Sequence, residues 1–152
     1  YAAAKAFVDL DLANYGWTFI NIDDGWEVKG NSEKPKRTSN EAILTNGKFP
    51  NMKKLGDDIH ALGLKFGIYS SPGPLTCGGF TGSYKHEFQD AKTFAAWGID
   101  YLKYNLCGLR DIMKDQYSSA ELIPPYELMH EALEEIDRDI IYSICEYGNG
   151  KV

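Results

Sequence analysis

Lys103 and Asn105 lie two residues apart in the stretch DYLKYNLCG (100–108), at the end of a segment whose other residues are typical of a strand. Side chains two residues apart along a strand point to the same side of it. A lysine directed into a protein is costly unless carboxylates or hydroxyl groups surround it. The pair therefore predicts a polar pocket at this strand end, in which Asn105 can form hydrogen bonds but carries no charge.

Two adjacent carboxylates, Asp23 and Asp24, follow the apolar run WTFINI, and Trp26 comes soon after them. Buried carboxylates need hydrogen-bond donors. The hydroxyl groups of a sugar are such donors, and the indole of Trp26 offers an apolar face to a pyranose ring. The alternative is that the two aspartates cap a turn, and the pair alone leaves both interpretations open.

Two more apolar segments end in residues of the same kind. LKFGIYS ends near Tyr69, and DIIYSICEYG ends with Glu146 and Tyr147. Taken singly, Tyr69 could be a core aromatic with a wet hydroxyl, and Glu146 a solvated loop acid. Taken together, the four segment ends suit an uncharged, polyhydroxylated ligand held by hydrogen bonds and stacking. No turn has the spacing of a dinucleotide-binding or P-loop motif, which argues against nucleotide binding.

The segments that must position these residues alternate between strand and helix patterns. Strands are expected at 17–24, 64–70, 99–105 and 139–148. Helices are expected at 1–14, 52–63, 86–98 and 126–136, the last after a loop that contains Pro124 and Pro125. This alternation predicts an α/β fold with a parallel sheet. Sites in such folds lie at the carboxyl ends of the strands.

Composition limits the possible partners. The chain has 152 residues, 43% of them hydrophobic, which is enough for one globular core. Its net charge of -6 argues against nucleic acid and anionic lipid as partners. No apolar run approaches the roughly 20 residues of a membrane span, and the first ten residues lack the apolar region of a signal peptide. A mature secreted chain would also lack that region, so the compartment stays open.

Three cysteines, Cys77, Cys107 and Cys145, are too few for a disulfide framework and lack zinc-binding spacing. We therefore expect no metal and no cofactor. All three could be buried free thiols. Cys77 and Cys107 follow consecutive parallel strands, so a disulfide between them is also sterically feasible. Such a bridge would indicate an oxidising compartment and would leave Cys145 free.

Several separated motifs resemble glycoside hydrolase family 27, the melibiase or alpha-galactosidase family. They are FINIDDGW, GKFPNMKKLGDDIHALGLKFGIYSSPG, TCGGFTGS, DAKTFAAWGIDYLKYNLC and YSICEYG, and they cover nearly the whole chain. The resemblance implies a TIM barrel followed by a β-sandwich domain. It also implies a retaining enzyme that removes terminal α-linked galactose or, in some members, α-N-acetylgalactosamine.

The resemblance also assigns roles to individual residues. The aspartate pair would bind the outer hydroxyls of the sugar, the two aromatic residues would wall the pocket, the lysine would donate to a ring hydroxyl, and the glutamate would lie near the 2-position. The positions expected to bind substrate are Asp23, Asp24, Trp26, Tyr69, Lys103, Glu146 and Tyr147. Cys77 and Cys107 match a pair that is disulfide-bonded in the family, which implies a secreted, periplasmic or lysosome-like location.

Asn105 departs from the family pattern. The family motif at this place is Lys-Tyr-Asp, and its aspartate is the catalytic nucleophile. A retaining glycosidase needs a carboxylate there to form the glycosyl-enzyme intermediate. We therefore expect this chain to hydrolyse its substrate very slowly or not at all, while the nearly isosteric Asn105 leaves sugar binding intact. A natural binding-only relative and a deliberately replaced nucleophile both fit this pattern.

Length is the second departure, because a (β/α)8 barrel takes about 250 residues. We expect residues 1–152 to form a single partial barrel segment, about half of the barrel, with four parallel strands and their helices. By the resemblance, the segment starts after the first barrel strand and stops after the fifth, and the general acid lies outside it. Glu146 does not match the position of that acid. Two open sheet edges would then favour pairing, so the expected partners are a galactose-containing glycan and either the rest of the barrel or a second copy.

Overall fold

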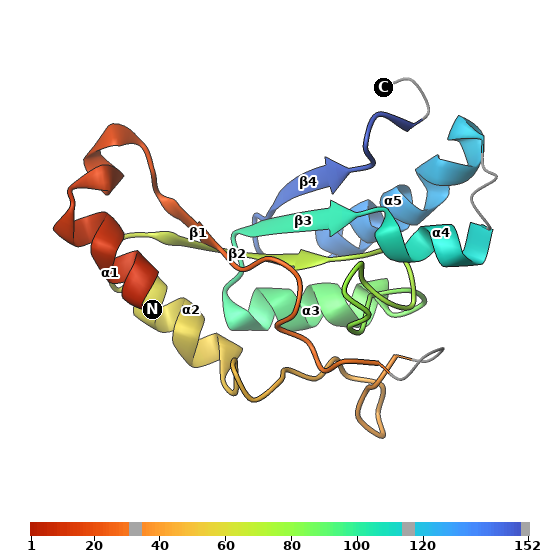
Figure 1. Ribbon diagram of the computed structural model, residues 1–152, viewed down its shortest axis with the longest axis horizontal. Helices are drawn as coiled ribbons and strands as arrows, with labels where there is room; N and C mark the ends of the chain where they lie inside the picture. Colours follow the sequence, from red (N-terminus) through yellow and green to blue (C-terminus); the bar gives the residue numbers. More distant parts are fainter. Residues whose placement is uncertain (31–34, 114–117, 150–152) are drawn as a thin grey trace.

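A computed structural model describes residues 1–30, 35–113 and 118–149 (Figure 1). Its centre is a sheet of four parallel strands in the order β1-β2-β3-β4. The strands are β1 (Phe19–Asn21), β2 (Lys65–Ser70), β3 (Tyr101–Asn105) and β4 (Ile141–Cys145). The expectation of four parallel strands is confirmed, although β1 and β4 are shorter than the sequence patterns predicted.

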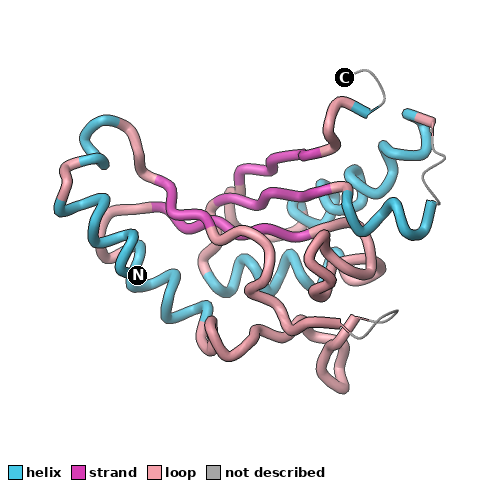
Figure 2. The backbone as a smooth tube through the Cα atoms, viewed as in Figure 1, coloured by secondary structure: helices cyan, strands magenta, loops and turns pink. Residues whose placement is uncertain are grey.

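The helices cover one side of the sheet and its two ends (Figure 2). They are α1 (Ala2–Asp9), the 3-10 turn η1 (Leu12–Tyr15), α2 (Met52–His60), α3 (Glu87–Trp97), α4 (Cys107–Met113) and α5 (Ser119–Glu134). Helix α3 lies between α2 and α5, and α4 follows the carboxyl end of β3 (Figure 1). This is the strand–helix alternation of a (β/α) barrel segment.

Alternation along the strands separates a core face from a polar face. Phe66, Ile68, Leu102 and Tyr104 are fully or almost fully buried and belong to the apolar cluster that includes α3 and α5. The residues between them point to the opposite side of the sheet. Lys103 is one of these, so β3 directs this side chain away from the helices that pack on the core face.

The helix expected at 1–14 ends at Asp9, and the separate 3-10 turn η1 follows it. Two further segments differ from the sequence-based expectation. Helix α5 begins at Ser119, so Pro124 and Pro125 lie inside a helix and not in a loop. A capping box in which Ser118 and Glu121 exchange hydrogen bonds explains the early start (Ser118 N to Glu121 Oε2, 2.7 Å). Cys107 was expected in a loop but begins α4.

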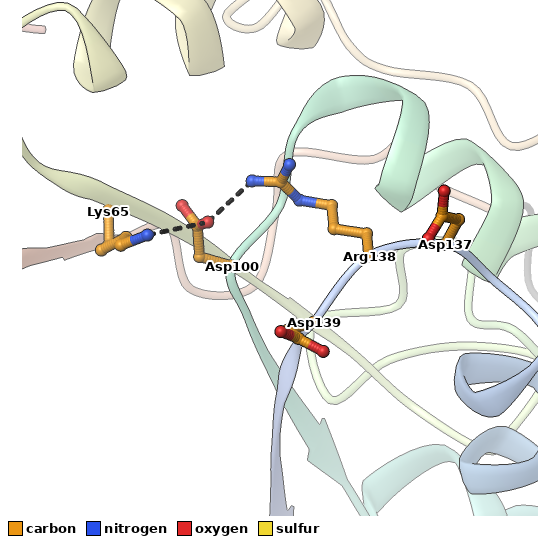
Figure 3. A pocket seen from close by; sticks show the side chains of 5 residues that line it. All are labelled: Lys65, Asp100, Asp137, Arg138 and Asp139. Atoms are coloured by element: carbon orange, nitrogen blue, oxygen red, sulfur yellow. Dashed lines mark hydrogen bonds and ion pairs between the residues drawn. The ribbon is translucent and has the colours of Figure 1, made fainter.

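The amino ends of the strands are joined by ionic contacts around Asp100 (Figure 3). Its Oδ2 accepts hydrogen bonds from Phe66 N (2.8 Å) and His60 Nε2 (2.7 Å), and its Oδ1 accepts from Arg138 (2.7 Å). A shallow polar pocket lies here, lined by Lys65, Asp100, Asp137, Arg138 and Asp139. The contacts link the starts of β2, β3 and β4, so the polar groups at this end of the sheet stabilise the fold.

The long segment between β1 and α2 is fixed to α3 by a buried ion pair. Arg37 contacts both carboxylate oxygens of Asp90 at 2.7–2.8 Å and also donates to the Gly82 carbonyl. The same segment therefore holds the loop 71–85, which follows β2, against the carboxyl end of the sheet. Within the described residues, no helix is long and apolar enough to cross a membrane.

Candidate functional site

Lys103, Tyr69 and Asp23 meet at the carboxyl ends of three strands. Tyr69 and Lys103 are register partners on β2 and β3. The Lys103 ammonium lies 5.2 Å from the centre of the Tyr69 ring and donates to Asp23 Oδ2 at 2.8 Å. The structure therefore brings together three residues that the sequence placed at separate strand ends.

The charges of this group support each other. Partial burial raises the pKa of Asp23, but hydrogen bonds from Lys103 and from the Asp24 N–H outweigh it and lower the pKa overall. The pKa of Lys103 is raised, first by its hydrogen bond to Asp23. Burial and the nearby Asp24 charge raise the pKa of Tyr69. At neutral pH the group therefore presents a cation, an anion and a neutral phenol.

Asp24 is held by the loop after β2. Its Oδ2 accepts a hydrogen bond from Gly78 N at 2.7 Å. The loop reaches this place because its backbone packs directly on α4. A Cβ at Gly73 would lie 2.0 Å from the Gly108 carbonyl carbon, and one at Gly108 would lie 1.5 Å from the Leu75 oxygen. Glycine at both positions therefore permits the contact that positions the loop.

Cys77 and Cys107 form a disulfide between this loop and α4, with their Cα atoms 5.0 Å apart. Cys77 Sγ accepts a hydrogen bond from the Tyr69 hydroxyl at 3.3 Å, and the Asn105 amide nitrogen lies 3.8 Å from it. The bridge implied by the family resemblance is present and borders the predicted pocket. Cys145 is a free thiol in the described structure, at the β4 position paired with Asn105.

Glu146 and Tyr147 lie in a turn beyond β4, not in the strand. Glu146 Oε1 accepts from Gly148 N at 2.7 Å, which orders the turn. The Tyr147 hydroxyl lies 3.2 Å from Cys107 Sγ. The disulfide thus connects this turn to the loop after β2, and both residues border the same end of the sheet as Lys103.

The position of Trp26 contradicts the expectation that its ring faces a sugar. Its side chain is completely buried, with its ring edge-to-face against Phe94 and Trp97 and its Nε1 donating to the Tyr69 carbonyl at 2.8 Å. A ring enclosed by α3 in this way offers no face to a sugar. Its contribution to the site is indirect, because the indole supports the strand that carries Tyr69.

Glu27 was missed by the sequence analysis. It is completely buried beside the Asp23–Asp24 pair, and Oε2 accepts one long hydrogen bond from Gly25 N (3.3 Å). Burial, reinforced by the Asp24 charge, raises its pKa to about 9. Glu27 is therefore neutral at pH 7. Its position in the motif DDGWE carried no signal of burial, because acidic residues after a turn are usually exposed.

Oxygen atoms without hydrogen-bond donors gather at this end of the sheet. Among the described residues, buried oxygens without a partner include Asp24 Oδ1, Asn105 Oδ1 and Glu146 Oε2, and also Glu27 Oε1, which belongs to a neutral carboxyl group. A buried polar atom left without a hydrogen-bond partner costs about 1–3 kcal/mol. Two of these four residues, Asp24 and Glu146, were expected from sequence to bind substrate, and Asn105 was expected at the nucleophile position. The arrangement favours a ligand that brings several hydroxyl donors.

The described residues contain no cluster of three or more metal-ligating side chains. The donor set of the site consists of carboxylates, an amide, a lysine and phenols around a disulfide. Such a set can form hydrogen bonds to a neutral polyhydroxylated molecule, with the Lys103 cation and the carboxylates of Asp23 and Asp24 to orient it.

Comparison with known proteins agrees with this chemistry. The family model described as "Alpha galactosidase A" (Melibiase_2) matches residues 2–150. Alpha-galactosidase A of Cellvibrio japonicus is 41% identical over 152 residues, which cover 99% of this chain and 34% of that protein. The chain therefore belongs to the melibiase, or alpha-galactosidase, family, glycoside hydrolase family 27.

Solved structures show the same fold. Alpha-galactosidase I of Mortierella vinacea has a TM-score of 0.86 and 40% identity, covering 97% of this chain and 36% of its own. The alpha-galactosidase of Saccharomyces cerevisiae with raffinose has a TM-score of 0.84 and 34% identity, covering 97% of this chain and 31% of its own. The four-stranded unit thus has the fold of part of the alpha-galactosidase barrels that it matches. The chain spans between 34% and 42% of the length of curated relatives it matches.

Proposed function

We propose that this chain carries the sugar-binding part of an alpha-galactosidase-type retaining glycoside hydrolase, which acts on terminal α-linked galactose. The observation that supports this most directly is that Asp24, Asn105 and Glu146, at the carboxyl end of the sheet that also carries the Lys103–Asp23 pair, each have an oxygen without a donor among the described residues. A pyranose supplies several hydroxyl donors from one rigid ring. It could therefore satisfy these acceptors together, while Lys103 donates to one of its oxygens.

Asn105 occupies the position of the nucleophile in the family. It is 4% exposed, its Oδ1 has no donor among the described residues, and its amide nitrogen lies against Cys77 Sγ. The neutral amide can neither attack the anomeric carbon nor stabilise positive charge that develops there. In the proposed function the pocket binds galactose, and hydrolysis is slow or absent as long as Asn105 stands there.

A second candidate function follows from the same residue. A binding-only galactose receptor would keep Asp24, Lys103 and Glu146 and would need no nucleophile. A preference for α-N-acetylgalactosamine is a variant of the first function, and it depends on contacts around the 2-position near Glu146. Residues 150–152, which continue this segment, lie outside the described residues.

Restoring the carboxylate tests the proposal. The full-length protein and its Asn105→Asp variant are assayed with an aryl α-galactoside, and galactose binding is measured by calorimetry on both. We expect galactose binding in both proteins and little turnover by the parent. In the variant, kcat/KM should rise by at least about 10³-fold, as expected for recovery of a catalytic nucleophile.

Asn40→Asp is the matched control, because Asn40 is exposed and lies outside the site; it should leave turnover unchanged. No gain in activity for Asn105→Asp would refute the nucleophile assignment. Failure of both proteins to bind galactose would refute the sugar site itself. Calorimetry with N-acetylgalactosamine beside galactose decides between the two substrates.

The compartment and partners follow from the same features. We propose an oxidising location, secreted, periplasmic or lysosome-like, because the Cys77–Cys107 disulfide borders the pocket and would be reduced in a cytosol. The ligand would be a galactose-containing oligosaccharide. The remaining strands of a barrel, or a second copy, would pair with the edge strands β1 and β4.

A further inference from the structure

Glu27 closes the turn that carries Asp24. Its side chain folds back over the turn, and Oε2 accepts a hydrogen bond from Gly25 N at 3.3 Å. Gly25 has a φ of 101°, in the left-handed region that favours glycine, so the chain can turn tightly here. Glu27 is completely buried, and its Oε1 meets no hydrogen-bond partner among the described residues. This buried acid therefore lies in the same turn as a residue that we propose to bind the sugar.

The backbone on both sides of this carboxyl group is held in place. Asn46 Nδ2 donates to the carbonyl of Gly25 at 2.7 Å and to that of Glu27 at 3.0 Å. Between them, the buried indole of Trp26 donates to the Tyr69 carbonyl at 2.8 Å. A buried carboxylate is costly unless it is paired or solvated. An ionised Glu27 could therefore reach water only if the turn moved.

The charged group that acts on Glu27 is Asp24. The segment 43–46, which pairs with the backbone of Glu27, has no ionisable side chain, and the only cysteine of the loop 76–81 is in the disulfide. Helix α3 packs on the turn with aromatic rings, and Lys29 holds its ammonium over an aromatic ring of the loop, 5.8 Å from the ring centre. Burial raises the pKa of Glu27 to about 9, and the Asp24 charge adds to this, although backbone N–H groups of the turn oppose it.

Asp24 connects the turn to the ligand. Its Oδ2 accepts from Gly78 N at 2.7 Å, whereas its buried Oδ1 has no donor among the described residues and is the atom proposed to accept a sugar hydroxyl. A bound sugar would exclude water from this place. A second negative charge on Glu27 would then lie beside Asp24 without solvent or a cation to compensate it. Sugar binding should therefore favour the neutral form of Glu27.

We propose that Glu27 is a positioning residue, whose neutral carboxyl group keeps the turn 24–27 in the form that binds galactose, so that the pocket releases the sugar when Glu27 ionises. This inference rests on the proposed function and adds a control by pH to it. Glu27 does not touch the sugar and acts through Asp24. Because linkage is reciprocal, galactose should in turn favour the proton on Glu27.

The first test is the pH dependence of galactose affinity. Calorimetry on the full-length protein gives the galactose Kd at pH 7.5 and at pH 10, with circular dichroism to verify that the protein is folded at both. With a pKa of about 9, about one molecule in ten keeps the proton at pH 10. The Kd of the parent should therefore rise about tenfold. The Glu27→Gln variant, which is neutral at every pH, should show the same Kd at both.

The second test counts protons. Calorimetry at pH 9, in two buffers that differ in their enthalpy of ionisation, gives the number of protons taken up when galactose binds. The parent should take up about 0.5 proton per galactose through Glu27, because half of the molecules are ionised before binding. The uptake by Glu27→Gln should be smaller by this amount. If Glu27 only stabilised the fold, the free energy of unfolding would change with pH, but sugar binding would take up no proton through Glu27.

Glu127→Gln is the matched control, because Glu127 is exposed on α5, and it should keep the pH dependence of the parent. A parent Kd that is equal at pH 7.5 and pH 10, or an equal rise in Glu27→Gln, would overturn this inference alone. If Glu27→Gln does not fold, the parent decides: no proton uptake at pH 9 would overturn the inference. Absence of galactose binding by the parent at pH 7.5 would overturn the proposed function and this inference with it.

Discussion

Buried carboxyl groups at the two ends of the sheet differ in their hydrogen bonding, and their pKa values are shifted in opposite directions. At the amino end, Asp100 accepts hydrogen bonds from Phe66 N, His60 and Arg138. Partial burial raises its pKa, but the hydrogen bonds from Phe66 and His60 and the charges of His60 and Arg138 lower it overall. At the carboxyl end, Glu27 has one long hydrogen bond, and burial raises its pKa to about 9.

This difference separates the end of the sheet that stabilises the fold from the end at which we propose that the ligand binds. At the amino end, the protein itself supplies the donors for Asp100. Its polar groups therefore stabilise the fold and leave few free acceptors for a ligand. The carboxyl end leaves acceptors such as Asp24 Oδ1 and Asn105 Oδ1 without donors among the described residues. Such a site costs stability before binding and recovers it when a ligand with hydroxyl donors arrives.

The largest expected effect concerns Glu27. Its pKa in the folded state lies above the ordinary value of 4.5, so the folded state holds the proton more tightly than the unfolded chain. The stability of the parent should therefore fall as the pH rises from 4.5 to about 9, by at most about 1.4 kcal/mol per pH unit. The Glu27→Gln variant has no ionisable group at this position. Its free energy of unfolding, measured with urea, should therefore increase relative to that of the parent as the pH rises over this range.

Glu127→Gln is the matched control for Glu27, because Glu127 is exposed on α5. It should follow the parent at every pH. If Glu27→Gln also follows the parent, the buried neutral acid at the functional end is disproved, and the contrast between the two ends becomes weaker.

The next effect concerns Asp100. Asp100→Asn should lower the free energy of unfolding at neutral pH by about 3 kcal/mol, because Arg138 and His60 lose a charged partner. The pKa of Asp100 is lower in the folded state than its ordinary value of 3.8, so the ionised carboxylate stabilises the fold at pH values above 3.8. This stabilisation is lost as the pH falls through the folded-state pKa. The difference between parent and variant should therefore shrink in acid.

Asp57→Asn is the control for this change, because its ion pair with Lys53 is exposed on α2. Calorimetry should show the same galactose Kd for the parent and Asp100→Asn. A change in galactose affinity with unchanged stability would reverse the assignment of the two ends.

The smallest effect concerns Lys103. Lys103→Met removes the hydrogen bond to Asp23 and the donor proposed for the sugar, and galactose affinity should fall about tenfold. Stability should change by less than about 1 kcal/mol, because this ion pair is partly exposed, with side-chain exposures of 34% and 69%. Lys54→Met, which removes an exposed ion pair to Asp58, is the control. A large loss of stability in Lys103→Met would show that Lys103 mainly stabilises the fold, which contradicts its proposed role in binding.

Much of the fold could be predicted because its signals are local. Short apolar runs such as KFGIYS alternate with amphipathic helices, and this order requires a parallel sheet with its sites at one edge. The two-residue period also placed Lys103 and Asn105 on one side of β3. Where opposing local signals met, the prediction failed: Pro124 and Pro125 indicated a loop, but the capping box of Ser118 and Glu121 starts α5 before them.

Two residues of one motif show the limit of sequence reasoning at the site. In DDGWE, Trp26 was expected to face a ligand and Glu27 carried no signal, yet both are completely buried. Their surroundings come from segments far away in the chain, since Phe94 and Trp97 of α3 enclose the indole. Burial of this kind is a property of packing, which a local pattern does not encode.

The sequence by itself determined the parallel sheet, the strand ends that carry polar groups, and the amide at Asn105. These follow from periodicity and from the chemistry of single residues. Only the tertiary structure decided which oxygens lack donors, that Glu27 is neutral, and that the Cys77–Cys107 disulfide lies between Asn105 and Tyr147. These features depend on distances between segments that meet only after the chain has folded.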